Sequence, residues 1–126
     1  MRGRVLIVDD EEATRQAIAE YFEAQGFVVD SACEAEEAEA LLTHVRYDAI
    51  LSDLRLTRIH GAEGLEIVGY VKERCPWTRI ILLTAHATPE LEMEALRRGV
   101  DHVLTKPQPL YRLVEVVAAA REGPQT

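Results

Sequence analysis

Residues 5–11 read VLIVDDE, and this stretch decides which class of fold the chain adopts. A continuous run of four apolar residues is followed directly by the acidic Asp9 and Asp10. Such a short apolar run is typical of a strand that is buried on both faces of a parallel sheet. Apolar residues between positions 13 and 22 then recur at helical spacing until Gly26 ends the predicted helix. The stretch therefore begins a unit of one strand followed by one helix.

The same unit recurs four more times along the chain. Parallel strands require crossover connections, and right-handed helical crossovers on both faces give a doubly wound α/β sandwich with a five-stranded parallel sheet. A closed barrel would require about eight such units. After the first unit, we predict strands at Phe27–Ala32, Ala49–Ser52, Arg79–Thr84 and His102–Thr105, and helices at Glu34–Thr43, Gly64–Arg74, Pro89–Arg98 and Leu110–Arg121.

The composition predicts one globular domain over residues 1–121, with residues 122–126 as a tail or linker stub. Apolar residues make up 48% of the chain and charged residues 29%, which is typical of soluble globular proteins. The net charge of -8 argues against direct binding to nucleic acid, because that surface must supply positive charge. The first residues form neither a signal peptide nor a membrane span, so we expect a cytoplasmic protein with no membrane partner.

The cysteines and histidines show no metal-binding pattern. Cys33 and Cys75 lack the spacing of a metal site, so we expect reduced, partly buried thiols. The histidines show no ligand pairing either, which argues against a zinc site and predicts surface or loop positions for His44, His60, His86 and His102.

Polar side chains follow the predicted strands at the edge where their carboxyl ends meet. Asp9 and Asp10 end the first strand, Asp53 the third, Thr84 the fourth and Lys106 the fifth. In a doubly wound sheet this edge carries the functional crevice. Three carboxylates packed together repel, so they require a shifted pKa or a cation, and oxygen ligands favour Mg²⁺. An aspartate nucleophile beside an ammonium and a hydroxyl then points to phosphoryl transfer through an acyl phosphate.

Each of these motifs has a purely structural interpretation when it is taken alone. The acidic run at residues 9–11 also suits the first turn of a helix, where the macrodipole favours negative charge. Thr84 also suits a helix cap, since Pro89 opens a helix soon afterwards, and Lys106 also suits a solvated surface charge. Their coincidence at the ends of separate strands favours the site.

The motifs together resemble the receiver domains of bacterial response regulators, which are phosphoacceptor domains of two-component signal transduction. The resemblance covers residues 4–121 and implies the flavodoxin-like strand order 2-1-3-4-5. It rests on four motifs in chain order: VDDE at residues 8–11, the segment from Asp48 to Leu54, Thr84-Ala85, and Lys106-Pro107.

The resemblance implies a role for each matching residue. Asp53 would be the phosphorylation site, and it would also bind Mg²⁺ with Asp10 directly, with Asp9 largely through water, and with the backbone carbonyl of Arg55. Lys106 and the Ala85 amide would contact the phosphoryl group, and Thr84 would move to hydrogen-bond it. The peptide bond before Pro107 would be cis. The remaining expectation, from position in the sequence, is that Arg55 and His86 tune how fast the phosphoryl group is lost.

By the same resemblance, a phosphohistidine of a sensor histidine kinase or phosphotransfer protein would donate the phosphoryl group. The added charge would then bias a two-state equilibrium, with an output domain, an effector protein or a homodimer as the responding partner. The domain would catalyse its own phosphorylation and dephosphorylation only, so we do not classify it as an enzyme.

The chain departs from the family pattern at two places. Val103 stands three residues before the lysine, where the family commonly has tyrosine or phenylalanine, so the route of the switch is atypical. Thr57 replaces a usual proline, and about three extra residues lengthen the loop after Asp53. Phosphorylation chemistry loses none of its groups by these changes.

Two other functions remain open from the sequence. A hydrolase with an aspartyl-phosphate intermediate would need a substrate-binding cap, and no insertion here is long enough. A receiver-like interaction module would keep the fold without being phosphorylated, and the atypical Val103 and longer loop leave this possibility open.

Overall fold

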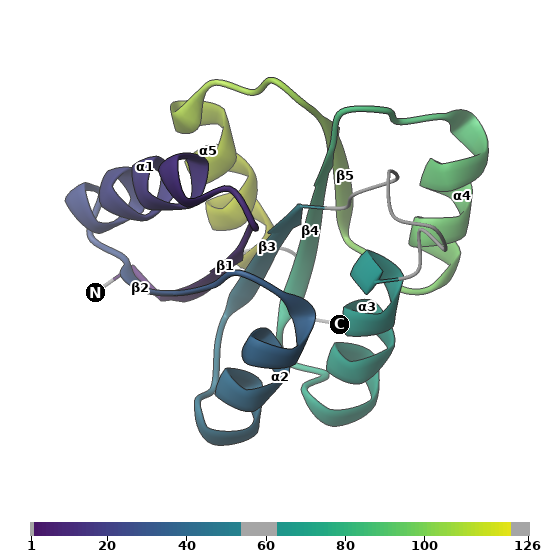
Figure 1. The fold of residues 1–126 in the computed structure, drawn as a ribbon, viewed down its shortest axis with the longest axis horizontal. Helices are drawn as coiled ribbons and strands as arrows, with labels where there is room; N and C mark the ends of the chain where they lie inside the picture. Colours follow the sequence, from purple (N-terminus) through teal and green to yellow (C-terminus); the bar gives the residue numbers. More distant parts are fainter. Residues whose placement is uncertain (1, 54–62, 122–126) are drawn as a thin grey trace.

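The structure, a computed structural model, describes residues 2–53 and 63–121. Strands and helices alternate along the whole of this part of the chain, as Figure 1 shows. The elements are β1 (Arg4–Val8), α1 (Glu12–Ala24), β2 (Val28–Ala32), α2 (Ala35–His44), β3 (Ala49–Asp53), α3 (Glu63–Arg74), β4 (Arg79–Thr84), α4 (Pro89–Arg97), β5 (His102–Thr105) and α5 (Leu110–Arg121).

The five strands form one parallel sheet in the order β2-β1-β3-β4-β5. Helices α1 and α5 cover one face, and α2, α3 and α4 lie on the other (Figure 1). The predicted α/β sandwich and its strand order are therefore confirmed. The chain first runs to one edge of the sheet through β2 and then to the other through β3, β4 and β5, so strand order reverses between β1 and β3.

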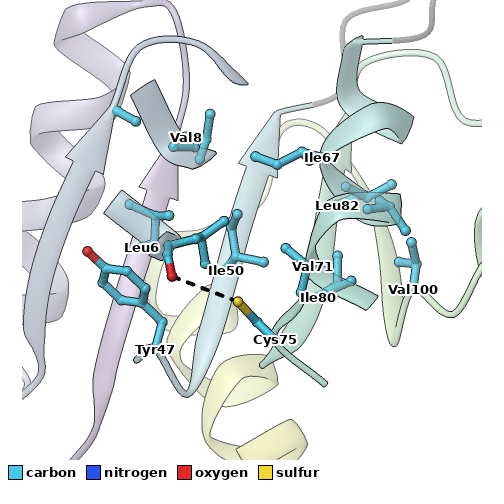
Figure 2. Close-up of a cluster of buried hydrophobic side chains, with 14 of the residues drawn as sticks. Leu6, Val8, Tyr47, Ile50, Ile67, Val71, Cys75, Ile80, Leu82 and Val100 are labelled. Atoms are coloured by element: carbon cyan, nitrogen blue, oxygen red, sulfur yellow. Dashed lines mark hydrogen bonds between the residues drawn. The ribbon is translucent and has the colours of Figure 1, made fainter. Parts of the chain in front are cut away.

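The sheet is buried from both faces, and alternate residues of each strand enter two separate cores. Figure 2 shows the core under α2, α3 and α4, where Leu6, Ile50, Ile80 and Leu82 pack against residues such as Val71. The other core lies under α1 and α5 and contains Val5, Ile7, Leu51, Ile81, Leu83, Phe22 and Val117. Continuous apolar strands are needed because each face meets helices rather than water.

The predicted boundaries are correct to within about one residue, and the differences have local causes. Phe27 was predicted to open the second strand, but its amide still donates to the carbonyl of Phe22, and β2 begins at Val28. Arg98 was predicted to lie in the fourth helix, but it is the C-terminal cap of α4. Gly99 follows it with a φ of +100°, a conformation that suits glycine because it lacks a Cβ.

The cysteine prediction is half right. Both thiols are free, and Cys75 is buried beside the carbonyl of Leu42 (Figure 2), but Cys33 is exposed rather than partly buried. Among the described histidines, His44, His86 and His102 are exposed as expected. No helix in the described part of the chain is long and apolar enough to cross a membrane.

We expect Leu82→Ala to lower the free energy of unfolding by about 2–5 kcal/mol, because it opens a cavity in a fully buried core. The matched control is Leu96→Ala on α4, where the side chain is 47% exposed and the same truncation is expected to cost less than about 1 kcal/mol. Urea denaturation followed by circular dichroism measures both changes. Equal losses in the two variants would contradict the assigned core.

Candidate functional site

Three aspartates meet where β1 and β3 end. Asp9 and Asp10 follow β1, and Asp53 is the last residue of β3, the strand beside β1 in the sheet. Each offers one carboxylate oxygen, and these three oxygens lie within 4.8 Å of one another. Neighbouring parallel strands end at the same edge, which is why residues so far apart in sequence converge.

Lys106 directly follows β5, and its ammonium reaches the carboxylate cluster. Its Nζ lies 2.9 Å from Asp53 Oδ1 and 3.6 Å from Asp9 Oδ2. The backbone amide of Lys106 donates to the carbonyl of Thr84 at 2.7 Å, which extends the pairing of β4 and β5 to the site. The bond between Lys106 and Pro107 is cis, as predicted.

Asp9 is buried, with an exposed fraction of 3%, and its two carboxylate oxygens are in different situations. Oδ1 accepts a hydrogen bond from the Glu11 amide at 2.8 Å. Oδ2 is buried without a hydrogen-bond partner within the described segments, although it faces the Lys106 ammonium. Burial raises the pKa of the Asp9 carboxyl, and the nearby Asp53 and Asp10 carboxylates add to the rise against the opposing effects of the Glu11 amide and Lys106.

These features fit a divalent cation. The unsatisfied Oδ2 atom of Asp9 and the oxygen-only donor set are what a hard ion such as Mg²⁺ requires. Asp10 is exposed, yet its carboxylate remains at the cluster, so this side of the site is open to solvent. The predicted carbonyl ligand of Arg55, the extra loop residues and Thr57 lie outside the described residues.

Thr84 ends β4 with its side chain fully buried, and it does not cap a helix. Its Oγ1 accepts a hydrogen bond from the backbone amide of His86 at 3.1 Å. The cap of α4 is instead Thr88, whose hydroxyl accepts from the Leu91 amide. The structural interpretation of Thr84 as a helix cap is therefore wrong. Its hydroxyl instead accepts a hydrogen bond within the loop that follows β4. Ala85 follows Thr84 and is exposed.

Val103 lies in β5, opposite Leu82 of β4, and is half-buried. It packs against the core under α2, α3 and α4. This atypical residue is thus part of the packing beside α4 and is separate from the carboxylate cluster.

Sequence reasoning missed a groove beside Lys106. It has a volume of about 570 Å³ and runs between the first turns of α1 and the segment that enters α5. The signal available in the sequence was the pair of small residues Ala13 and Ala17 one turn apart on α1. The groove is lined by Glu11, Ala13, Thr14, Ala17, Ile18, Leu83, Lys106, Pro107, Gln108, Leu110 and Leu113.

The sequence profile of the response regulator receiver domain matches residues 5–118. The chain belongs to this family. One relative of the receiver domain is the alginate biosynthesis transcriptional regulatory protein AlgB of Pseudomonas aeruginosa, which is 34% identical over 84% of this chain. The chain spans 23% of the length of AlgB.

Solved receiver structures share the fold. The Francisella response regulator 1452 receiver domain superposes with a TM-score of 0.84 at 28% identity, covering 95% of this chain and 97% of that one. A response regulator from Burkholderia pseudomallei, solved with a phosphorylated aspartic acid, a calcium ion and citrate, has a TM-score of 0.82 at 27% identity. That comparison covers 94% of this chain and 69% of the other.

We expect Asp9→Asn to stabilise the metal-free receiver domain at pH 7 by about 1–3 kcal/mol, since it removes a buried charge whose Oδ2 atom has no hydrogen bond. A raised folded-state pKa means that the contribution of Asp9 to stability is complete below the pKa of unfolded aspartate, about 4, and is lost as pH rises through the folded value. The advantage of the variant therefore shrinks as pH falls from 7 towards 4.

Urea denaturation of both proteins at several pH values, with and without Mg²⁺, measures this effect. Saturating Mg²⁺ is expected to stabilise the wild type more than the variant. An advantage of Asp9→Asn that stayed constant with pH would count against the raised pKa.

Proposed function

We propose that this receiver domain is a phosphorylation-activated switch of a two-component system in which Asp53 accepts the phosphoryl group. The observation that carries the proposal is the ammonium of Lys106, 2.9 Å from Asp53 Oδ1, at a cluster of three carboxylates. The phosphorylated aspartic acid in the similar Burkholderia pseudomallei response regulator supports the same chemistry here.

Asp9, Asp10, Asp53 and the backbone carbonyl of Arg55 would hold Mg²⁺. The bound ion would neutralise negative charge that accumulates on the phosphoryl oxygens during transfer. The Asp9 Oδ2 atom supports this assignment, because it is buried without a hydrogen bond and the Lys106 ammonium approaches it only to 3.6 Å. A bound divalent ion would offset the remaining cost of burying this oxygen.

The transfer step uses one carboxylate oxygen of Asp53 as the nucleophile. This oxygen forms a bond to phosphorus while the bond from phosphorus to the donor's imidazole nitrogen breaks, and the electron pair of the broken bond stays on the imidazole. Lys106 holds Asp53 before the reaction and can follow the transferred group as an ion pair with a phosphoryl oxygen. The open side at Asp10 gives the donor its access.

The conformational response begins at Thr84. In the present structure its hydroxyl oxygen accepts from the amide of His86, so the hydroxyl proton is able to donate elsewhere. After phosphorylation, the Thr84 hydroxyl and the Ala85 amide donate to phosphoryl oxygens, and the segment that leads to α4 moves with them. Val103 is the atypical residue, and it packs against the core under α2, α3 and α4, which includes Ala95 of α4.

We infer that the phosphoryl donor is a phosphohistidine of a sensor histidine kinase or phosphotransfer protein. The groove supports this, because it offers a largely apolar docking surface beside Lys106, whose ammonium contacts Asp53. The responding partner is an output domain, an effector protein or a second copy of the domain. The net charge of -8 disfavours DNA as a direct partner. We place the domain in the cytoplasm. The domain acts on itself and is not an enzyme with a released product.

We expect the protein to gain one phosphoryl group when it is incubated with Mg²⁺ and acetyl phosphate. Intact-mass spectrometry measures the gain, and Asp53→Asn serves as the matched control because it is nearly isosteric but lacks the nucleophilic oxygen. Omission of Mg²⁺ is expected to slow the wild-type reaction strongly. An interaction module without the chemistry would gain nothing, and a hydrolase would turn over a substrate many times.

We also expect Arg55→Ala and His86→Ala to change the rate at which the phosphoryl group is lost. His86 is exposed and follows Thr84 by two residues, and Arg55 follows Asp53 by two residues in the sequence, so we expect both to influence the attack of water on the acyl phosphate. The decay of phosphorylated protein after removal of donor measures the rate, with Arg98→Ala at the end of α4 as the control. Unchanged decay in both variants would show that neither residue tunes hydrolysis.

A further inference from the structure

Arg15 makes a contact that none of the assigned roles explains. Its guanidinium Nη1 donates a hydrogen bond to the backbone carbonyl of Asp9 at 2.7 Å, across six residues of chain. Arg15 lies in the first turns of α1 and is half-buried. A charged donor at this distance makes a strong hydrogen bond, and the planar guanidinium fixes its direction.

This contact completes a set of restraints on Asp9. The Asp9 amide donates to the carbonyl of Ala32 at 3.1 Å, which ties the residue to β2. Its Oδ1 accepts from the Glu11 amide, which ties it to the start of α1. The guanidinium of Arg15 holds the remaining backbone group, so only Oδ2 of Asp9 is left facing the cluster without a hydrogen bond.

The carbonyl that Arg15 holds belongs to the peptide bond between Asp9 and Asp10. Fixing the orientation of this peptide plane also fixes the position of the Asp10 Cα and the axis of its φ rotation, which restricts the directions in which the Asp10 side chain can leave the backbone. Asp10 is exposed, so core packing does not hold it at the cluster as burial holds Asp9. The restraint that Arg15 applies to this peptide therefore acts on the less buried of the two neighbouring carboxylates.

We propose that Arg15 is a positioning residue of the Mg²⁺ site: it holds the Asp9–Asp10 peptide so that both carboxylates converge with Asp53 on one ion. This inference rests on the proposed function, because it assumes that the cluster binds Mg²⁺. Residues that orient metal ligands in this way commonly contribute a factor of ten or more to metal affinity.

The direction in which Mg²⁺ affinity changes when Arg15 is replaced distinguishes a positioning role from a purely electrostatic one. Arg15 carries a positive charge beside Asp9, at the edge of an acidic site. If that charge were its main influence, removing it would make the site more negative and strengthen Mg²⁺ binding. Loss of a positioning contact has the opposite consequence, because the ligands must then be ordered when the ion binds.

The test is isothermal titration of the metal-free protein with Mg²⁺ alone. We expect Arg15→Met, which keeps the length of the side chain but removes its charge and donors, to raise the dissociation constant roughly tenfold. Arg98→Met is the matched control, since it removes the same charge from a guanidinium that pairs with Glu94 at the far end of α4. It is expected to leave the dissociation constant unchanged. Unchanged or tighter binding by Arg15→Met would overturn the proposal.

A second measurement guards against a general loss of structure. Hydrogen exchange of the Glu11 amide, followed by nuclear magnetic resonance, reports whether the turn around Asp9 is held. We expect faster exchange at Glu11 in Arg15→Met while amides in β3 and β4 exchange at the wild-type rate. Uniformly faster exchange would identify a folding defect and refute a local positioning role, and Arg15→Gln provides a smaller change for the same comparison.

Mg²⁺ binding by the wild type distinguishes a failure of this proposal from a failure of the proposed function. If the wild type binds no Mg²⁺, the proposed phosphorylation-activated switch is wrong, whatever the variants do. If the wild type binds Mg²⁺ and Arg15→Met binds it equally well, the switch survives and only the role of Arg15 is refuted.

Discussion

Three carboxylates whose oxygens lie within 4.8 Å of one another repel, and the rest of the structure depends on holding them together. Asp9 directly follows β1 and Asp53 ends β3. These strands are adjacent, and their apolar residues are buried on both faces of the sheet. The ammonium of Lys106 offsets part of the repulsion from the side of β5. Without the tightly packed cores, the acidic residues would separate into solvent, where each is more stable as an anion.

Much of this arrangement could be predicted from the sequence because it follows from where strands end. The apolar run before Asp9 indicates a strand buried on both faces, and parallel strands with helical crossovers place their carboxyl ends at one edge. Position along the strands therefore predicts that Asp53, Thr84 and Lys106 lie at this same edge. The order of the strands came from the family resemblance, and the sheet confirms it.

The features that sequence reasoning missed depend on the reach of individual side chains. Periodicity places Arg15 on α1 but does not show that its guanidinium returns to the Asp9 carbonyl. The cap of α4 was missed for another reason: a proline at the first helical position places the cap at the residue directly before it, which is Thr88 and not Thr84. The groove beside Lys106 depends on how closely α1 approaches the chain after Pro107. Contacts of this kind are set by tertiary packing and leave no repeating pattern.

The cluster takes Asp53 from the middle of the chain and its ammonium from Lys106, directly after the last strand. During synthesis the residues up to Asp53 leave the ribosome long before Lys106 does, and a chain of this size folds as a unit. A partly made protein therefore presents acidic residues with no lysine to complete them. The cluster of three carboxylates and one ammonium is therefore complete only once β5 has joined the sheet.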